Sequence, residues 1–305
     1  MTALVSGGSG LVGRYIVNAL LGAGLDVVVA GRHRPSDSHF SKPVRFRRLS
    51  LDDDTVPAGL FNDVQNFVHA AFDHEPGRYR GGEGDDPDGF RRRNLEGSVR
   101  LFETARRAGV SRTVFLSSRA VYDGLPAGEP LVEEASLSPA GLYGQVKHDC
   151  EQALAALNTS GFVTASLRLT GVYGGLRPNK WDALVADYLA GREISVRAGS
   201  EVHGEDVGKV VCLMLAASAE DIGGRSFNVS DIVADTRDIL AGLGVTGETL
   251  PEPADKSSVA VMDTRRIREL GWRPGGWPLF AATLLSLAHD AGLDAASRAA
   301  DDQAS

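Results

Sequence analysis

The sequence has few cysteines, no long apolar runs and no excess of positive charge, and each shortage excludes a class of protein. Its 305 residues include two cysteines, Cys150 and Cys212. They form no motif typical of a disulfide scaffold or a zinc site, so we expect no metal. No apolar run is long enough to cross a bilayer, and the first residues lack the basic start and apolar stretch of a signal peptide. We therefore expect a cytoplasmic protein with no membrane partner.

The charge balance also argues against a nucleic-acid partner. The chain carries 32 Lys and Arg against 40 Asp and Glu, a net charge of −8. Binding a nucleic acid would require a clustered excess of basic residues. The basic run 91–93 is short, and we expect it to be the solvated start of a helix. Glycine, in contrast, is abundant at 36 residues, which is typical of folds with many tight turns between strands and helices.

Short apolar runs alternate with longer helical patterns over the first part of the chain. Strands are predicted at 3–6, 26–30, 44–49, 66–70, 113–117 and 163–169, and helices at 11–21, 94–108 and 143–157. Strands separated by helices predict an α/β protein with a doubly wound parallel sheet, the Rossmann fold. We assign residues 1–170 to this dinucleotide-binding domain, with its sheet completed by part of 200–230.

The rhythm changes after residue 170, where loops rich in proline and glycine separate the elements. Helices are predicted at 181–190 and 206–217, and strands at 193–196 and 226–229. This stretch is too short and irregular for a second doubly wound domain. Residues 171–291 are therefore expected to form mainly a smaller substrate-binding cap, and the small and polar residues 292–305 a flexible tail.

A glycine-rich turn joins the first strand to the first helix. Its spacing is G-x-x-G-x-x-G, and its glycines let the main chain turn tightly and approach a pyrophosphate. The start of the following helix offers free N–H groups to the phosphates. The residues predicted to contact a dinucleotide here are Gly7, Ser9, Gly10, Leu11, Val12 and Gly13.

The end of the second strand bears on the choice of cofactor. Sites selective for NAD usually carry an Asp or Glu here for the ribose 2′-hydroxyl, but this chain has Gly31 followed by Arg32. A guanidinium can pair with the additional phosphate of NADP through two hydrogen bonds. The sequence therefore favours NADP, with NAD as the alternative.

A Tyr-x-x-x-Lys motif, Tyr143 and Lys147, opens a predicted helix. Residues four apart share one helical face, so both side chains can reach the same cleft. A cation beside a phenol favours its ionised form, so that Tyr143 could exchange protons with a reacting oxygen. Ser118 ends a predicted strand at the edge of the sheet where ligands bind in such folds, and its hydroxyl can fix that oxygen.

These motifs together resemble the extended short-chain dehydrogenase/reductase family, in its NAD-dependent epimerase/dehydratase group. The resemblance runs to about residue 274 and includes 68–71, 94–97, 117–122 and 168–174. It implies that Ser118 is the catalytic hydroxyl, that Tyr143 is the general acid and base, and that Lys147 holds the ribose hydroxyls. It also implies cofactor contacts from Ala70, Ala71, Asn94, Leu169, Thr170 and Val172.

Three departures from the family pattern bear on the reaction and on the cofactor contacts. Arg119 and Ala120 follow Ser118 where dehydratases of this group carry acidic residues, which disfavours dehydration. The aspartate that usually reads the adenine after the third strand is replaced, leaving Ser50 and Leu51 as cofactor contacts. Nucleotide-sugar epimerases usually carry an arginine for the diphosphate shortly before a Val-His pair, and none stands at that point in 199–203.

Three functions are compatible with these observations. The first is an NAD(P)-dependent dehydrogenase or reductase that transfers hydride at a secondary alcohol or ketone of a small carbohydrate-like substrate. The second is a nucleotide-sugar epimerase with tightly bound NAD, and the third is a non-catalytic dinucleotide sensor. The intact Ser-Tyr-Lys set argues against the sensor. The resemblance further implies a homodimer through the helices at 94–108 and 143–157, for which the apolar candidates are Val146, Ala153, Leu154 and Leu157.

Overall fold

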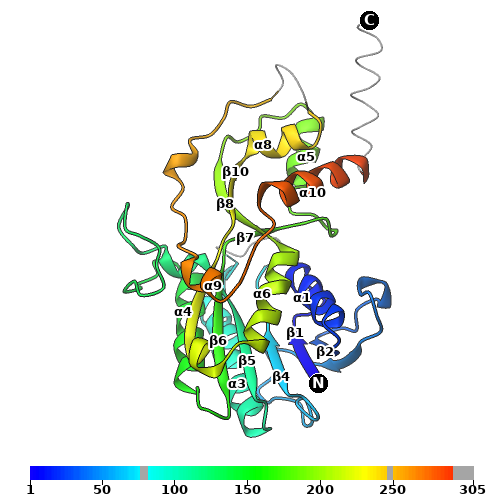
Figure 1. Cartoon of the computed structure of the whole chain (residues 1–305), viewed down its shortest axis with the longest axis vertical. Helices are drawn as coiled ribbons and strands as arrows, with labels where there is room; N and C mark the ends of the chain where they lie inside the picture. The colour runs from blue at the N-terminus through cyan, green and yellow to red at the C-terminus, as the bar shows by residue number, and fades with distance from the viewer. Residues whose placement is uncertain (76–81, 246–249, 291–305) are drawn as a thin grey trace, which may run out of the picture. The chain divides into compact units, whose positions relative to one another are not determined.

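The computed structural model describes residues 1–75, 82–245 and 250–290, and the chain forms two compact units (Figure 1). The first unit contains residues 1–169, 207–229 and 262–272, and the second contains 170–206, 230–261 and the described residues from 273 onward. Two segments from beyond residue 170, 207–229 and 262–272, thus belong to the first unit. The tail predicted over 292–305 lies outside the described residues.

A seven-stranded parallel sheet forms the centre of the first unit. Its strand order is β3-β2-β1-β4-β5-β6-β9, the order of doubly wound dinucleotide-binding folds, so the predicted Rossmann architecture is confirmed. Strands such as β1 and β2 are buried almost continuously because helices cover both faces. The strands are β1 (Thr2–Ser6), β2 (Asp26–Gly31), β3 (Arg45–Arg48), β4 (Asn66–His69), β5 (Arg112–Ser118), β6 (Val163–Leu169) and β9 (Arg225–Val229).

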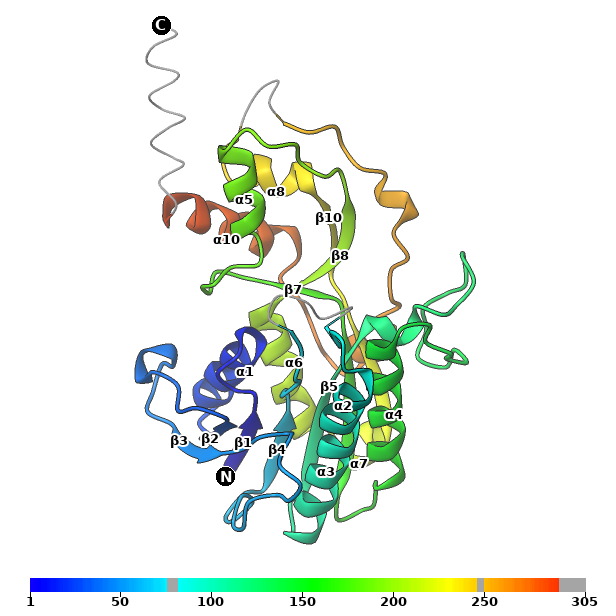
Figure 2. The same ribbon diagram turned by 180° about the vertical axis from the view of Figure 1, so that it is seen from behind.

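Two pairs of helices cover the faces of this sheet. On one face lie α1 (Leu11–Gly22) and α6 (Gly204–Ala216), and on the other lie α3 (Gly97–Arg107) and α4 (Leu142–Ala156) (Figures 1 and 2). The first pair packs closely because Gly208 has no side chain: a Cβ there would lie 2.7 Å from the Cβ of Ala19. None of the helices in the described ranges is long and apolar enough to cross a membrane.

The shorter elements of the first unit connect these layers. These elements are the 3₁₀ turns η1 (Asp37–His39) and η3 (Arg119–Tyr122), the helices α2 (Pro87–Arg91), α7 (Ala219–Ile222) and α9 (Arg265–Glu269), and the π-helical turn η2 (Arg92–Glu96) that leads into α3. Asp86 caps α2 by accepting a hydrogen bond from the main-chain N–H of Gly89 at 2.9 Å.

The second unit is built on a three-stranded sheet of order β10-β8-β7. In its core Tyr173 stacks on Trp181, and Phe280 packs edge-on against both, with ring centroids 5.5 to 5.9 Å apart. Its elements are β7 (Gly171–Tyr173), α5 (Asp182–Leu189), β8 (Ala198–His203), β10 (Ile232–Asp235), α8 (Thr236–Gly242), η5 (Lys256–Ser258) and α10 (Gly276–Asp290).

One predicted strand of the second unit is wrong. The sequence predicted a strand at 193–196, but the strand begins only at Ala198. Val196 is 48% exposed, so the predicted segment does not bury its apolar residues as a strand packed on a core would. Pairing with β7 and β10 determines where β8 forms, and both partners are distant in the sequence from the residues that suggested the strand.

Candidate functional site

The carboxyl ends of the central strands meet at one edge of the first unit's sheet. Ser6 of β1 pairs in register with Ala30 of β2 and with His69 of β4. The glycine-rich turn, the end of the second strand and the segment after the fourth strand therefore lie together. This edge is where ligands bind in open α/β sheets.

A cavity of about 450 Å³ lies at this edge. It is lined by twelve of the residues predicted to contact the cofactor: Gly7, Ser9, Gly10, Leu11, Val12, Gly13, Gly31, Arg32, Ser50, Leu51, Ala70 and Ala71. Its other lining residues are Leu49, Asp52, Phe72, Asp73, His74 and Arg93. All of them belong to the first unit.

The glycines of the turn shape the cavity by their lack of side chains. Gly7 has a φ of +70°, and a Cβ on it would lie 2.7 Å from the Cα of Ala71. A Cβ on Gly13 would lie 2.1 Å from the carbonyl oxygen of Gly7. Among the described residues no side chain caps α1, so the N–H groups of its first turn stay available to an anion. These features fit a dinucleotide diphosphate.

Three charged residues that line the cavity, Asp52, Asp73 and Arg93, were not predicted as site residues from the sequence. Arg93 was expected to be part of a solvated helix start, but its side chain is only 21% exposed and lines the cavity. Asp73 lies beside it, with its Oδ2 atom 2.8 Å from Nε of Arg93. The positions of Asp73 and Arg93 in the sequence could have indicated that they line the cavity. Asp73 follows the predicted contact Ala71 within two residues, and Arg93 immediately precedes the predicted contact Asn94.

Asn94 lies behind the cavity. It is fully buried, and its side chain accepts a hydrogen bond from the N–H of Asp73 and donates to the carbonyls of Asp73 and Phe90, at 2.7, 2.7 and 3.0 Å. Asn94 therefore anchors the segment that lines the cavity. Of the remaining predicted contacts, Leu169 ends β6 in the first unit, whereas Thr170 and Val172 belong to the second unit.

Ser118 ends β5 and caps the following 3₁₀ turn. Its Oγ accepts a hydrogen bond from the N–H of Ala120 at 3.2 Å. α4 lies close to this turn because Gly144 has no side chain: a Cβ there would lie 2.4 Å from the carbonyl oxygen of Ala120. Gly144 is the residue after Tyr143, so the close approach brings the start of the Tyr-x-x-x-Lys helix to the segment that follows Ser118.

Phe72 connects the cavity with Tyr143 and Lys147. It lines the cavity, and its ring packs edge-on against Tyr143 with centroids 5.2 Å apart. The ammonium of Lys147 lies 4.3 Å from the Phe72 centroid and 5.9 Å from the Tyr143 centroid. Lys147 also donates a hydrogen bond to the carbonyl of Leu116 at 2.7 Å. Tyr143 and Lys147 thus share one cluster at the cavity wall, in agreement with their spacing of four.

Burial dominates the ionisation of this cluster. Lys147 is 5% exposed, and desolvation lowers its pKa from 10.5 to about 8. Nearby His69 is fully buried, and desolvation with the charge of Lys147 lowers its pKa to about 3. His69 is a neutral core residue, bonded to Ser6 at 2.6 Å and to Ser98 at 2.8 Å. Because the Ser98 hydroxyl donates to the carbonyl of Asn94, we infer that Nε2 of His69 carries the proton.

A buried ion pair holds α4 against the sheet. Arg168 of β6 donates to Glu151 of α4 through Nε and Nη2, the latter at 2.8 Å, and both side chains are 5% exposed. Arg168 also donates to the hydroxyl of Tyr122 at 2.7 Å. Glu151 is four residues after Lys147, so the pair fixes the helix that carries the Tyr-x-x-x-Lys motif. Among the described residues, no three His, Cys, Asp or Glu gather into a metal site.

The strand order, the glycine turn and the cluster at the cavity wall define a dinucleotide-binding enzyme fold of the short-chain dehydrogenase/reductase type. A comparison with known families makes this specific: the profile of the NAD dependent epimerase/dehydratase family matches residues 3–230. The chain belongs to this family and is an enzyme of the extended short-chain dehydrogenase/reductase type.

Individual relatives extend the likeness over most of the chain. The UDP-glucose 4-epimerase of Mycolicibacterium smegmatis is 29% identical over 301 residues, covering 90% of this chain and 94% of the relative. The solved Thermus thermophilus UDP-glucose 4-epimerase, in complex with NAD, is 26% identical with a TM-score of 0.73, covering 93% and 99%. The dTDP-glucose 4,6-dehydratase DesIV of Streptomyces venezuelae, at 24% identity and a TM-score of 0.76 over 96% and 98%, shares the fold.

Proposed function

We propose that the chain is an NADP(H)-preferring dehydrogenase or reductase that acts on a secondary alcohol or ketone of a carbohydrate-like substrate. The observation that carries the proposal is the position of Phe72, which lines the glycine-rich cavity and contacts both Tyr143 and Lys147. The predicted proton-exchanging pair therefore adjoins the cavity that fits a dinucleotide. A non-catalytic sensor would not need this pair.

The proposed roles follow from the chemistry of the side chains. The hydroxyl of Tyr143 protonates the reacting oxygen in reduction and accepts a proton from it in oxidation. The hydroxyl of Ser118 donates a hydrogen bond to the same oxygen. Lys147 offers ammonium donors to the ribose hydroxyls and favours the phenolate of Tyr143. When bound, the nicotinamide supplies the redox chemistry.

The preference for NADP(H) rests on Arg32. Arg32 lines the cavity immediately after Gly31, where a carboxylate would repel a 2′-phosphate, and its side chain is 70% exposed. Hydrogen bonds to charged groups are worth about 1.5–3 kcal/mol and less in solvent, and about 1.4 kcal/mol corresponds to tenfold. From these free energies we propose that the chain binds NADP(H) about 10- to 100-fold more tightly than NAD(H).

A nucleotide-sugar epimerase with tightly held NAD is the second candidate. It is favoured by the relatives, since the Mycolicibacterium smegmatis protein is a UDP-glucose 4-epimerase matched over 90% of this chain. Against it stands Gly199, close to the point where epimerases usually carry an arginine for the diphosphate. In the same unit, the ammonium of Lys180 is already paired with Glu201.

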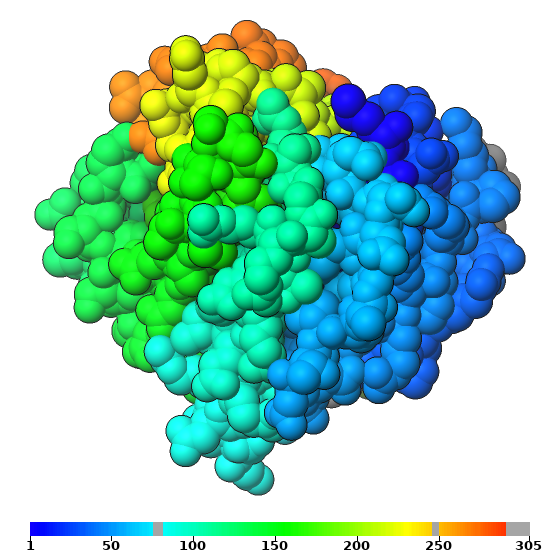
Figure 3. All heavy atoms as spheres, turned by 90° about the horizontal axis from the view of Figure 1, so that it is seen from below, coloured from blue at the N-terminus to red at the C-terminus, as the bar shows by residue number. Residues whose placement is uncertain are grey.

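A homodimer through α3 and α4 completes the proposal. The two helices lie side by side, as their teal and green atoms show in Figure 3, and a groove along them is lined by Leu95, Val99 and Ala153 among charged residues. Two of the predicted interface positions, Val146 and Leu154, are instead buried in the core of the same chain. Light scattering at micromolar concentration should give twice the chain mass, and a monomer would contradict the proposal.

Two experiments test the proposed function. Tyr143→Phe should lower turnover roughly 100-fold or more, because the proton donor is lost, while binding of NADPH stays within about twofold. A variant with near wild-type turnover would remove Tyr143 from its role. Mass spectrometry of the purified protein separates the two candidates, because an epimerase should retain stoichiometric NAD and a reductase should not. A reductase should instead exchange added NADPH and oxidise it when a ketose or keto-sugar is supplied.

A further inference from the structure

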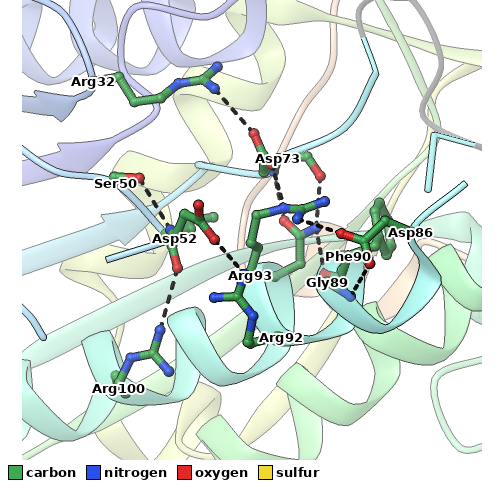
Figure 4. A network of polar contacts seen from close by, with 12 residues as sticks. Arg32, Ser50, Asp52, Asp73, Asp86, Gly89, Phe90, Arg92, Arg93 and Arg100 are labelled. Atoms are coloured by element: carbon green, nitrogen blue, oxygen red, sulfur yellow. Dashed lines mark hydrogen bonds and ion pairs between the residues drawn. The ribbon is translucent and has the colours of Figure 1, made fainter. Parts of the chain in front are cut away.

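A chain of charged side chains lines one end of the cavity. Figure 4 shows Arg32, from the end of β2, directed at Asp73, and Arg93, from the turn before α3, on the other side of the same carboxylate. Arg32 Nη1 lies 3.3 Å from Asp73 Oδ1, and Arg93 Nε lies 2.8 Å from Asp73 Oδ2. One carboxylate is therefore shared by two guanidinium groups, and all three residues line the cavity.

Asp73 and Arg93 are both held in place by the surrounding structure. Asn94, fully buried, fixes the main chain of Asp73 through hydrogen bonds in both directions at 2.7 Å. Arg93 immediately precedes Asn94, and its Nη1 pairs with Asp86 at 3.1 Å. Because Arg93 is 21% exposed and Arg32 is 70% exposed, Arg93 is the more firmly positioned of the two cations.

The ion pair between Arg93 and Asp73 is poorly aligned. The Nε of Arg93 is buried and close to Asp73, but the N–H makes no hydrogen bond of acceptable geometry within the described part of the chain. An anion with several oxygens would offer this N–H a better-aligned acceptor than the Asp73 carboxylate does. The other carboxylate that lines the cavity, Asp52, pairs with Arg92 at 2.8 Å and not with Arg93.

We propose that Arg93 and Asp73 determine the choice between NADP(H) and NAD(H), in addition to Arg32. Arg93 is the second ligand of the 2′-phosphate. Asp73 is the resident counter-ion that holds both guanidinium groups in the absence of that phosphate and limits its affinity by like-charge repulsion. This inference rests on the proposed function, since it concerns the same dinucleotide site.

The test compares dissociation constants of NADPH and NADH, measured by fluorescence titration of the full chain. Asp73→Asn keeps the shape and removes the repulsion, so NADPH should bind roughly 3- to 10-fold more tightly while NADH stays within about twofold. Arg93→Gln should weaken NADPH about tenfold, and Arg93→Lys should restore part of the loss. Arg34→Gln is the matched control: Arg34 pairs with Asp37 outside the cavity lining, so its loss should leave the NADPH-to-NADH ratio unchanged.

The outcomes separate this inference from the proposed function. If Arg32→Gln abolishes the preference and neither Asp73→Asn nor Arg93→Gln changes the ratio, the inference is overturned and the proposed function stands. If Asp73→Asn weakens NADH instead, Asp73 is a ribose acceptor and the inference is wrong. If wild type binds NADH more tightly but the two variants still shift the ratio in opposite directions, only the proposed NADP preference fails. If wild type binds neither dinucleotide, both are overturned. Unchanged NADH affinity in each variant shows that its site has folded.

Discussion

Replacing Lys147 by methionine gives a quantitative test of the site's electrostatics. The side chain is 5% exposed, and burial lowers its pKa from 10.5 to about 8. A shift of this size corresponds to about 3 kcal/mol of unfavourable free energy for the charged form in the folded state. Methionine keeps the apolar stem between Phe72 and Phe115 but removes the charge.

The sign of the pH effect follows from proton binding. Below pH 8 the lysine is protonated in both states, so the cost of the buried ammonium is fully present. Between pH 8 and 10.5 the unfolded chain binds more protons than the folded one, so wild-type stability rises relative to Lys147→Met. From pH 7 to pH 10 the difference in unfolding free energy between the two proteins should shift by about 2 kcal/mol in favour of wild type.

Urea denaturation at both pH values measures this difference, and subtracting the variant cancels the other titrating groups. The matched control is Lys42→Met, which removes an exposed ammonium that also donates to a carbonyl, that of Leu21 at 3.1 Å. This control shows at each pH the effect of removing an exposed ammonium. A difference for Lys147→Met that does not change between pH 7 and pH 10 would refute the buried charged lysine. The same reasoning predicts that dinucleotide binding weakens as the pH rises through about 8, because Lys147 loses its ammonium donors.

Three further predictions concern stability and the shape of the cavity. Glu151→Gln leaves Arg168 buried without its carboxylate, which should lower the free energy of unfolding by about 3–5 kcal/mol in chemical denaturation. Gly13→Ala should weaken NADPH binding at least about tenfold in titration, because its Cβ would lie 2.1 Å from the carbonyl oxygen of Gly7 and displace the turn. Gly22→Ala, on the same helix but with no neighbouring atom within 4 Å, is the control. It should leave NADPH binding unchanged and raise the free energy of unfolding by about 0.5–1 kcal/mol. Weakened binding in this control would show that any change in α1 disturbs the cavity.

Local pattern was sufficient for the sheet and for the glycine turn. The strand predicted at 163–169 and the helix predicted at 143–157 agree with β6 (Val163–Leu169) and α4 (Leu142–Ala156) to within a residue, because each has a strong period and a clear boundary. The second unit was harder. The helix α10 (Gly276–Asp290) was not predicted, since it begins with Gly276 and Pro278, which are typical of a turn, although proline is tolerated in the first turn of a helix.

The site shows the same limit. The residues of the turn could be predicted because glycine spacing reports main-chain geometry directly. The pairing of Asp73 with Arg93 could not, because it depends on how the segment after β4 meets the start of α3, and no local pattern encodes that contact. Gly144 was part of the motif, but its need for close approach to Ala120 is visible only in three dimensions.

The interleaving of the two units has a consequence for how the chain can be cut. A fragment that ends at residue 170 lacks β9, so β6 becomes an open edge whose N–H and C=O groups can pair with another chain. The same fragment lacks α6, which packs through Gly208 against α1, and so exposes one apolar face of the sheet. On the ribosome, too, the sheet stays incomplete until residue 229 has emerged, and the first unit closes only with residues 262–272. The nucleotide-binding half is therefore not separable as an N-terminal piece, and expression of residues 1–170 alone should give aggregates.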